Sequence, residues 1–518
     1  MAGREQSAAR RGRAGRWAAG CLALAVGGLA AHPTPADDHV TPAGDFRPLP
    51  ELASRNGVLT ATLTAEPKAI IIDGVRLDAL VFNGEYGGPV LRLKPGDRLR
   101  LTLVNHIGLP VNLHFHGSHA APTGHGDNMH LEVDPGRRFD YRLTIPLDQP
   151  PGLYWYHTHI HGLAEQEVNG GLSGAMIIDG VETRVPAVAG ARQRLLVLKT
   201  FNLARPDDAD VARLHGVVQS INGAAHAEIA GKAGATEFWR ISNQSPNDYY
   251  HLSIKGLHFR IVGLDGPATG RPIDADRLDV PPAGRIEALV TLPGPGAYPL
   301  LSGATPTGVG RAMKVTRELA VLKVDESIPP LTAAAPPAPA PPAPPPQSVD
   351  LSQATITAKR LIVFSQKPGE EVYLINGKVY DHDRIDTRVP LGSIEEWTVR
   401  NDTDDMHVFH IHQVHFQLMS IDGAPQPFDR VLDTVRVPER GEVVVRIPFT
   451  NPLMVGRFLY HCHVLKHEDK GMMANIEVYD PKAEQGAARA PAGLSLLSWL
   501  LPRPQPWAPI CRAKTGSP

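Results

Sequence analysis

The chain repeats one sequence unit three times, and this repeat limits the folds that it can adopt. Each copy has an Asn-Gly pair, an apolar segment that ends in asparagine, a segment with a histidine, and a glycine before alternating apolar residues. The Asn-Gly pairs are Asn83-Gly84, Asn222-Gly223 and Asn376-Gly377; the segments that end in asparagine are 101–105, 239–243 and 397–401; the glycines are Gly136, Gly284 and Gly441. Asn-Gly is typical of tight turns between strands, and self-similar segments indicate a repeated structural unit. We therefore expect three copies of one β-rich domain.

Short alternating strands separated by turn residues fill each unit, and the 49 glycines and 49 prolines agree with a turn-rich architecture. A unit of about 130–150 residues with this pattern is typical of a Greek-key β-sandwich. We predict an all-β protein with three consecutive domains at residues 40–185, 186–330 and 350–482. Residues 331–349 are mostly Ala and Pro and are expected to form a semi-rigid linker. Residues 483–518 are expected to form a poorly ordered tail.

Residues 1–31 are typical of an export signal. The arginines Arg10, Arg11, Arg13 and Arg16 precede an apolar run from Trp17 to Ala31. The adjacent Arg10 and Arg11 are consistent with a twin-arginine signal, and a short anchor helix is the alternative. No other apolar run approaches the ~18 residues that a membrane helix needs. We expect an exported protein, periplasmic or secreted, without a membrane span in the mature chain, and the net charge of −2 indicates no nucleic-acid partner.

Cys462 lies in a stretch that suits copper. Of the three cysteines, Cys21 falls in the predicted signal and Cys511 in the predicted tail, so no disulfide framework is expected. Cys462 stands between His461 and His463, and His467 and Met472 follow. One thiolate, two imidazoles and a weak axial methionine are typical of a blue-copper electron-transfer site. A buried free cysteine in a histidine-rich strand is the alternative.

Side chains alternate between the two faces of a strand. Cys462 is therefore expected on one face, with His461 and His463 on the other. Two metal sites would then be joined through three consecutive residues, which provide a short covalent path for electrons.

Four histidine pairs with the spacing His-x-His lie in the first and third units. They are His114 and His116, His157 and His159, His410 and His412, and His461 and His463; His407 precedes the third pair. Both histidines of a pair share one face of a strand. We expect the first and third domains to face each other across a pseudo-twofold axis, with eight imidazoles around one cavity, a number that suits three copper ions. The second unit lacks the histidines that close the other two, and we expect it to set the distance between them.

In order and spacing, these clusters resemble the copper signatures of the multicopper oxidases, specifically the three-domain laccase-like and copper-efflux-oxidase-like enzymes. The resemblance covers about residues 40–482 and implies cupredoxin-like domains with four copper ions. It implies type 1 ligands at His407, Cys462, His467 and Met472; type 2 ligands at His114 and His410; and type 3 ligands at His116, His157, His159, His412, His461 and His463.

Two carboxylates also resemble residues of this family. Glu468 resembles a glutamate that relays protons towards the dioxygen site, and Asp127 an aspartate beside the type 2 copper. Reduction of dioxygen consumes protons, which positioned carboxylates can supply. Four further histidines, His119, His125, His130 and His161, are interpreted as extra copper-capture ligands or solvated loop residues, and hydrogen-bond donors to the copper ligands are the alternative. His258 and His415 are expected to have structural roles.

We predict a laccase-like oxidase that takes single electrons from phenols or aromatic amines and reduces dioxygen to water. Electrons are expected to enter near His467, as the exposed ligand. The alternative is an oxidase of cuprous, ferrous or manganous ions that serves copper tolerance. The nine methionines include no methionine-rich run, which argues against a dedicated cuprous oxidase. A copper-free relative that keeps the fold as a structural protein is the remote alternative, and no oligomeric state is predicted.

Overall fold

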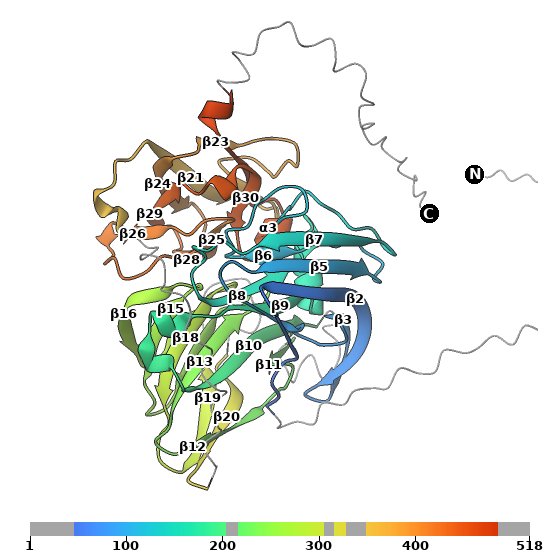
Figure 1. Cartoon of the computed structure of the whole chain (residues 1–518), viewed down its shortest axis with the longest axis vertical. Coiled ribbons are helices and arrows are strands. Elements are labelled where there is room, and N and C mark those ends of the chain that lie inside the picture. Colours follow the sequence, from blue (N-terminus) through green and yellow to red (C-terminus); the bar gives the residue numbers. More distant parts are fainter. Residues whose placement is uncertain (1–45, 204–215, 305–314, 328–348, 485–518) are drawn as a thin grey trace, which may run out of the picture. The chain divides into compact units, whose positions relative to one another are not determined.

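The computed structural model describes residues 46–203, 216–304, 315–327 and 349–484 (Figure 1). All of them belong to one compact unit. The predicted export signal, nearly all of the predicted linker and nearly all of the predicted tail lie outside the described residues. The described part is built of strands, with short helices such as α1 (Ala164–Gly170) and α3 (Leu465–Asp469). None of its helices is long and apolar enough to cross a membrane.

The strands of the first group form two sheets, in the orders β1-β4-β9-β8-β6 and β3-β2-β5-β7. Their bounds are β1 (Glu51–Ala53), β2 (Val58–Ile72), β3 (Val75–Phe82), β4 (Val90–Leu93), β5 (Arg98–Asn105), β6 (His114–His116), β7 (Arg138–Thr144), β8 (Gly152–His157) and β9 (Ser173–Ile178). One apolar core contains Leu101 and Tyr141 from one sheet and Tyr156 and Met176 from the other. The two sheets therefore pack as a sandwich.

The second group has the sheet orders β11-β10-β13-β18-β15-β16 and β12-β20-β19-β14-β17. Its strands are β10 (Arg192–Asn202), β11 (Val217–Ile221), β12 (Ala227–Lys232), β13 (Thr236–Asn243), β14 (Tyr250–Ile254), β15 (Phe259–Leu264), β16 (Ala268–Ala275), β17 (Leu278–Val280), β18 (Arg285–Thr291), β19 (Gly296–Ser302) and β20 (Arg317–Asp325). Trp239 of one sheet and Leu322 of the other share a core. This group is a second sandwich.

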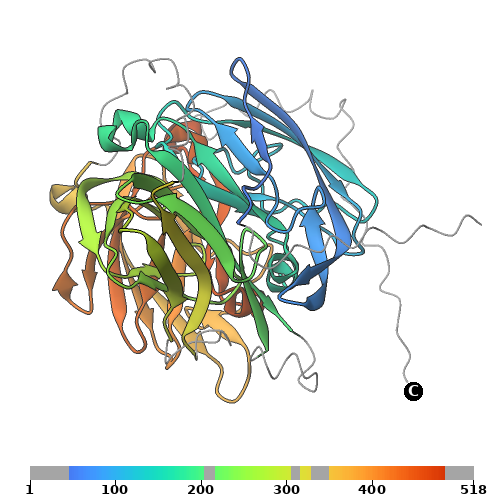
Figure 2. The same ribbon diagram turned by 90° about the horizontal axis from the view of Figure 1, so that it is seen from below.

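The third group has the orders β22-β21-β24-β29-β26-β27 and β23-β31-β30-β25-β28. Its strands are β21 (Ala358–Gln366), β22 (Tyr373–Ile375), β23 (Thr387–Pro390), β24 (Ser393–Asn401), β25 (His407–Ile411), β26 (Gln417–Ile421), β27 (Ala424–Pro425), β28 (Thr434–Val437), β29 (Glu442–Phe449), β30 (Gly456–Cys462) and β31 (Met473–Tyr479). Trp397 and Phe409, from different sheets, share its core. Figure 2 shows that strands close in colour, and so in sequence, stay together in each group.

Corresponding strands have the same partners in the three groups. β2 pairs in parallel with β5, β10 with β13, and β21 with β24. β6 pairs antiparallel with β8, β14 with β19, and β25 with β30. The prediction of three all-β sandwich domains is confirmed. The residue numbers that we predicted for the domain boundaries stay predictions.

The repeated asparagines make the same hydrogen bonds in each copy. The side-chain amides of Asn105, Asn243 and Asn401 each donate to two backbone carbonyls, and each side-chain oxygen accepts a backbone N–H two residues on. The Asn-Gly pairs adopt positive φ at both residues, as at Asn83 (+53°) and Gly84 (+77°). Such dihedrals define the turn that best fits the twist of a hairpin. The repeat in the sequence therefore corresponds to repeated Asn-Gly turns and to repeated asparagines that hold loops by hydrogen bonds.

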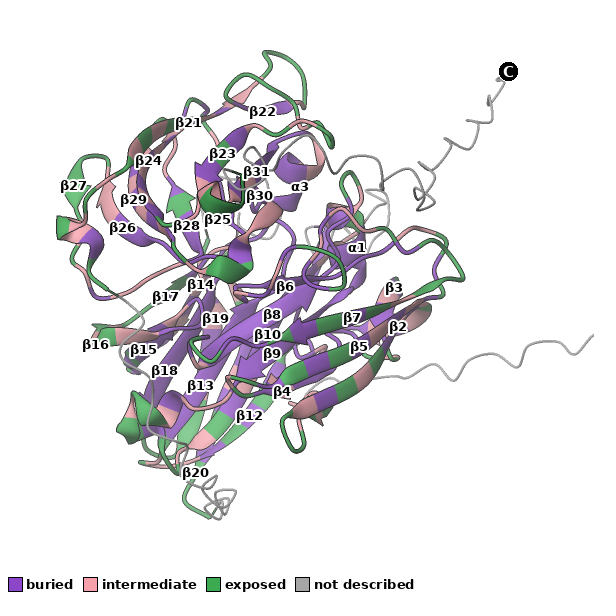
Figure 3. Cartoon of the chain, turned by 45° about the horizontal axis from the view of Figure 1, so that its top comes forward, coloured by how far each residue is buried: buried purple, intermediate pink, exposed green. Residues whose placement is uncertain are grey.

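Burial distinguishes two kinds of strand. Along β24 and β29, buried residues alternate with partly exposed ones, as expected for strands with one face on a core. β8, β9 and β25 are instead buried at every residue, so neither face meets water (Figure 3). β8 and β25 carry histidines of the predicted copper clusters. Their second face is therefore covered by protein, which keeps water away from these histidines.

Candidate metal centre

The histidine pairs occupy equivalent places in the first and third domains. β6 and β8 pair so that His114 lies opposite His157, and β25 and β30 pair so that His410 lies opposite His461. In both domains the second histidine of each pair lies within or just beyond the strand end. The strand register thus gathers four imidazoles at one end of each sandwich.

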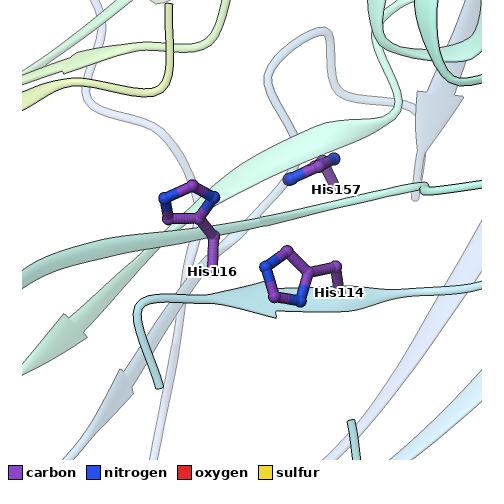
Figure 4. Close-up of side chains that lie close together, drawn as sticks. All are labelled: His114, His116 and His157. Atoms are coloured by element: carbon purple, nitrogen blue, oxygen red, sulfur yellow. The ribbon is translucent and has the colours of Figure 1, made fainter. Parts of the chain in front are cut away.

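The eight imidazoles meet in one buried group, here called the eight-histidine cluster. Its members are His114, His116, His157, His159, His410, His412, His461 and His463, each at most 2% exposed. His114 stacks on His412 with ring centroids 3.8 Å apart, and His116 stacks on His410 at 3.9 Å, both at 11°. Figure 4 shows His114 and His116 on one strand with their rings gathered near His157. The crossed stacks agree with the predicted pseudo-twofold arrangement of the two domains.

The nitrogens of the cluster converge as ligand atoms do. Nε2 of His461 lies 3.2 Å from Nε2 of His159 and 3.1 Å from Nε2 of His412. Other ring nitrogens are buried without a hydrogen-bond partner: Nε2 of His114, His157 and His410, Nδ1 of His116, and both nitrogens of His463. Three groups within the cluster have ligand atoms close enough to hold an ion: His114, His116 and His157; His114, His410 and His412; and His159, His412 and His461. Buried polar atoms normally have partners, so a metal ion fits this cluster.

Hydrogen bonds determine which nitrogen three of the rings present. Nδ1 of His114 contacts the Asp127 carboxylate at 3.0 Å. Nδ1 of His157 contacts the carbonyl of Thr158 at 2.9 Å, and Nδ1 of His461 the carbonyl of Cys462 at 3.1 Å. A carbonyl or carboxylate oxygen only accepts, so each of these nitrogens carries the proton. The opposite nitrogen keeps its lone pair for a metal.

Six of the eight rings are neutral at neutral pH. Burial lowers the pKa of His159 to about 3, although the nearby Glu468 charge opposes this shift. Burial also holds the pKa of His116, His157, His410, His412 and His463 well below the usual value, and contacts with neighbouring histidines add to the effect. Neutral imidazole is the form that binds copper.

A second group, here called the Cys462 site, lies beside the cluster. Sγ of Cys462 is 3.4 Å from Nδ1 of His407 and 3.7 Å from Nδ1 of His467, and these two nitrogens are 2.9 Å apart. Met472 is fully buried in the same apolar core as Cys462. Burial raises the pKa of the thiol to about 12, so the thiol keeps its proton until a cation replaces it. His461, next in the chain, belongs to the eight-histidine cluster, which agrees with the predicted opposite faces.

The expectation that His467 is exposed is wrong. His467 and His407 are both 0% exposed. The ring of Tyr373, on β22, covers His467 with a centroid separation of 4.1 Å. The contact between Tyr373 and His467 could not be predicted from the sequence, because the two residues lie more than ninety positions apart.

Both predicted carboxylates lie at the eight-histidine cluster and are fully buried. Oxygens of Glu468 lie 3.0 Å from Nδ1 of His461 and 3.5 Å from Nδ1 of His159. Asp127 contacts His114, accepts the backbone N–H of Phe115, and accepts from the side chain of Gln413 in the third domain.

Two charged residues at the cluster were not predicted from the sequence. Oδ1 of Asp433 lies 3.1 Å from Nε2 of His116, and Asp433 is paired with Arg285 of the second domain. Neither residue lies in a histidine motif. In the sequence, a charged residue beside a strand end resembles an ordinary surface residue. Its neighbours therefore do not predict contact with the cluster.

The remaining histidines differ from one another. Nε2 of His119 lies 2.7 Å from Nδ1 of His415, which ties the first domain to the third. His125 is exposed and stacks on Phe139. His130 packs against His382, and the exposed His161 against Tyr380. His258 pairs with Asp276 at the surface, so none of these histidines lies within the eight-histidine cluster.

Comparison with protein families finds three consecutive multicopper oxidase models. They match residues 64–183, 193–327 and 341–482. Together these matches span most of the chain, and each covers one of the three β-sandwiches.

Similar proteins agree with these matches. The multicopper oxidase mco of Staphylococcus haemolyticus is 24% identical over 448 residues, which cover 83% of this chain and 91% of that protein. The cell division protein FtsP of Xenorhabdus nematophila is 24% identical over 451 residues, covering 83% and 92%. Among solved structures, a Campylobacter jejuni multicopper oxidase described as a metallo-oxidase superposes with a TM-score of 0.72 at 27% identity, covering 85% of this chain and 96% of that chain. The chain is thus a copper oxidoreductase with cupredoxin-like domains, and it belongs to the multicopper oxidase family.

Proposed function

We propose that this protein oxidises a reducing substrate one electron at a time and reduces dioxygen to water, with four copper ions per chain. The observation that carries the proposal is the pair of crossed stacks, His114 on His412 and His116 on His410, which bring eight imidazoles together beside Cys462. We assign His407, Cys462, His467 and Met472 to the type 1 copper. We assign the eight-histidine cluster to three further ions: His114 and His410 to type 2, and His116, His157, His159, His412, His461 and His463 to type 3.

When bound, copper supplies the redox chemistry, accepting single electrons at the Cys462 site and delivering them to dioxygen at the eight-histidine cluster. The protein supplies the path and the environment. Cys462 is bonded through the backbone to His461 and His463, so a covalent route of three residues joins the two sites. Complete burial of both sites excludes water, which strengthens electrostatic interactions within them.

Two carboxylates are placed to handle protons. Glu468 lies against Nδ1 of both His461 and His159, and it can pass a proton towards the reaction space from within hydrogen-bond reach. Asp127 holds the proton of His114 on Nδ1, which directs Nε2 of that ring to the metal.

Phenols and aromatic amines are the proposed electron donors. A specific observation favours a second class, the metal ions. Tyr373 covers His467, and the carboxylates of Glu371 and Asp405 act electrostatically on Tyr373. Glu371 is itself paired with Lys466 and Lys470. A small cation can approach a covered ligand more closely than a bulky aromatic ring can. The similar C. jejuni enzyme is described as a metallo-oxidase, so cuprous, ferrous and manganous ions form the second candidate class.

The proposal is tested by oxygen uptake with copper-loaded protein. Phenols, aromatic amines, and cuprous, ferrous and manganous ions are each supplied as the sole reductant, with metal-free protein as the control. We expect uptake with at least one donor, four electrons taken from donor for each dioxygen consumed, and no uptake without copper. Copper-replete protein that consumes no dioxygen with any donor would contradict the proposal. A chain that binds no copper at all would instead favour a structural role, as the name of the FtsP relatives suggests.

We also propose that the protein acts outside the cytoplasm, because residues 1–31 have the charge and apolar pattern of an export signal. The test is N-terminal sequencing of protein recovered from the periplasm and medium. Recovery in the cytoplasm alone would contradict this proposal.

A further inference from the structure

The second domain places one charged side chain at the eight-histidine cluster. Arg285 begins β18, and its side chain is fully buried. Its guanidinium is paired with the Asp433 carboxylate of the third domain through both oxygens, with Nη1 2.9 Å from Oδ1. Two parallel bonds of this kind fix the orientation of both groups.

Asp433 contacts two histidines of the cluster, one from each outer domain. Its Oδ1 accepts from Nε2 of His116 at 3.1 Å, and its backbone carbonyl accepts from Nδ1 of His410 at 2.7 Å. Both oxygens are acceptors only, so these ring nitrogens carry the protons. The two opposite nitrogens, Nδ1 of His116 and Nε2 of His410, are buried without partners, and the two rings stack at 3.9 Å.

The guanidinium is held in turn by the backbone of two domains. It donates to the carbonyls of Ala283 at 2.7 Å and Asp265 at 2.8 Å in the second domain. It also donates to the carbonyl of Leu153 in the first domain at 3.4 Å. All five N–H donors of Arg285 are therefore occupied, and its guanidinium cannot turn away from Asp433 without leaving buried groups unpaired.

Gly117 leaves space for the Arg285–Asp433 pair next to His116. A Cβ at Gly117 would lie 2.6 Å from Oδ2 of Asp433 and 3.0 Å from Nη2 of Arg285, and Gly117 has φ +79°. Any other residue would push the pair away from His116, so glycine is required there on two grounds.

Stability alone is a weak reason for such a pair. Replacing a buried ion pair by apolar residues is often neutral or stabilising, because desolvation of the charges offsets their attraction. Asp127, which contacts His114, has a glutamine rather than an arginine as its partner. The arginine is thus specific to the side of the cluster where one residue, Asp433, contacts His116 through its carboxylate and His410 through its backbone carbonyl.

We propose that Arg285 and Asp433 are positioning residues for the copper centre: Arg285 holds Asp433, and Asp433 directs Nδ1 of His116 and Nε2 of His410 towards the metal. The domain without copper ligands thereby helps to build the centre. This inference rests on the proposed copper assignments of His116 and His410. It replaces the expectation that the second domain serves mainly to set the distance between the outer domains.

The test compares Arg285→Met, Asp433→Ala and Asp433→Asn with the unsubstituted protein after copper loading. The measurements are copper per chain, the blue absorption band of the Cys462 site, and the electron paramagnetic resonance signal of the type 2 copper. We expect the blue band to persist in all three variants, because neither residue contacts the Cys462 site. We expect an altered type 2 signal, because a displaced His116 would disturb His410, the assigned type 2 ligand on which it stacks at 3.9 Å. Copper affinity at the eight-histidine cluster should be lower by about 10–100-fold in Arg285→Met and Asp433→Ala.

Arg285→Lys and Arg194→Met are the controls. Arg285→Lys keeps the charge and should restore part of the type 2 signal lost in Arg285→Met. Arg194 forms a buried pair with Glu237 in the same domain, but its partners include no histidine of the cluster. Arg194→Met should change thermal stability without changing the type 2 signal, which separates positioning from a general effect on folding.

Wild-type signals in Arg285→Met and Asp433→Ala would overturn the inference while leaving the proposed function intact. Asp433→Asn keeps the size of the side chain and is therefore the variant expected to fold if the other two do not. In that case, an unchanged type 2 signal in Asp433→Asn would overturn the inference. Unsubstituted protein that binds no copper at the eight-histidine cluster would instead contradict the proposed function.

Discussion

At the scale of single residues, the Cys462 site depends on a thiolate that no other side chain reproduces. Sγ of Cys462 lies within 3.7 Å of ring nitrogens of both His407 and His467. A serine hydroxyl has nearly the same volume but is a hard, weakly acidic oxygen, whereas copper in such a site binds a soft thiolate.

Cys462→Ser is expected to abolish the blue band and the turnover of electron donors while sparing the fold. Absorption spectroscopy of copper-loaded protein and a thermal melt check both parts. The type 2 resonance signal should remain, because the eight-histidine cluster is unchanged. A variant that keeps its blue band would show that Cys462 is not the copper ligand.

The ring of Tyr373 covers His467. It lies 4.1 Å from that imidazole, and burial raises the pKa of the phenol to about 12, with the charges of Asp405, Glu371 and Cys462 adding to the shift. The phenol is therefore neutral in the working range of pH.

Tyr373→Ala should expose His467 and raise kcat/KM for a phenolic donor by roughly tenfold, or ~1.4 kcal/mol of barrier. Steady-state oxygen uptake measures this change. Tyr373→Phe is the matched control, because it keeps the cover and removes only the hydroxyl. If Tyr373→Ala slows all donors alike, Tyr373 conducts electrons rather than shielding the ligand.

At the scale of elements, β10 carries a buried lysine against the first domain. Nζ of Lys199 bonds the Ser173 hydroxyl at 2.5 Å and lies 5.0 Å from the ring centre of Tyr86. Burial lowers the pKa of Lys199 from 10.5 to about 7. Between these two values the unfolded chain holds a proton at Lys199 that the folded chain has lost.

Stability must therefore rise with pH across this window, from about pH 7 to 10.5, by up to about 1.4 kcal/mol per pH unit from this group. Lys199→Met should remove that part of the rise and raise the melting temperature most near pH 7. Calorimetry from pH 7 to pH 9 measures both effects, with the exposed Lys323→Met as control. Parallel curves for the unsubstituted protein and Lys199→Met would contradict this expectation.

At the scale of the whole molecule, copper is expected to hold the first and third domains together. The ligands of the eight-histidine cluster come from both domains, and a ligand that binds the folded state alone stabilises it by mass action. Nε2 of His461 in the third domain lies 3.2 Å from Nε2 of His159 in the first domain and 3.1 Å from Nε2 of His412, so these ligand atoms are close enough to share an ion.

Removal of copper should lower the melting temperature and speed amide exchange in β6, β8, β25 and β30. Strands of the second domain that pair only within that domain, such as β12 with β20, should change little. Hydrogen–deuterium exchange of copper-loaded and chelated protein measures the difference, and calorimetry measures the melting temperature. Exchange that rises equally in all three domains would show that the metal does not act at the boundary between the first and third.

Much of the architecture could be predicted because its signals are local. The Asn-Gly turns, the asparagine anchors and the alternating strands depend on neighbouring residues and recur three times. The His-x-His pairs follow from the two-residue period of a strand. The strand registers that place His114 opposite His157 and His410 opposite His461 come from the structure, because the spacing within one strand does not determine its partner residues.

The sequence by itself determined three β-sandwiches and two sets of histidine pairs at matching places, because strand period and turn chemistry are written in adjacent residues. Only the tertiary structure decided that Tyr373 covers His467 and that Arg285 reaches Asp433 across 148 positions. The contact between Asp433 and His116 spans 317 positions. Contacts over such separations depend on how whole domains pack, and no periodic pattern in one chain records them.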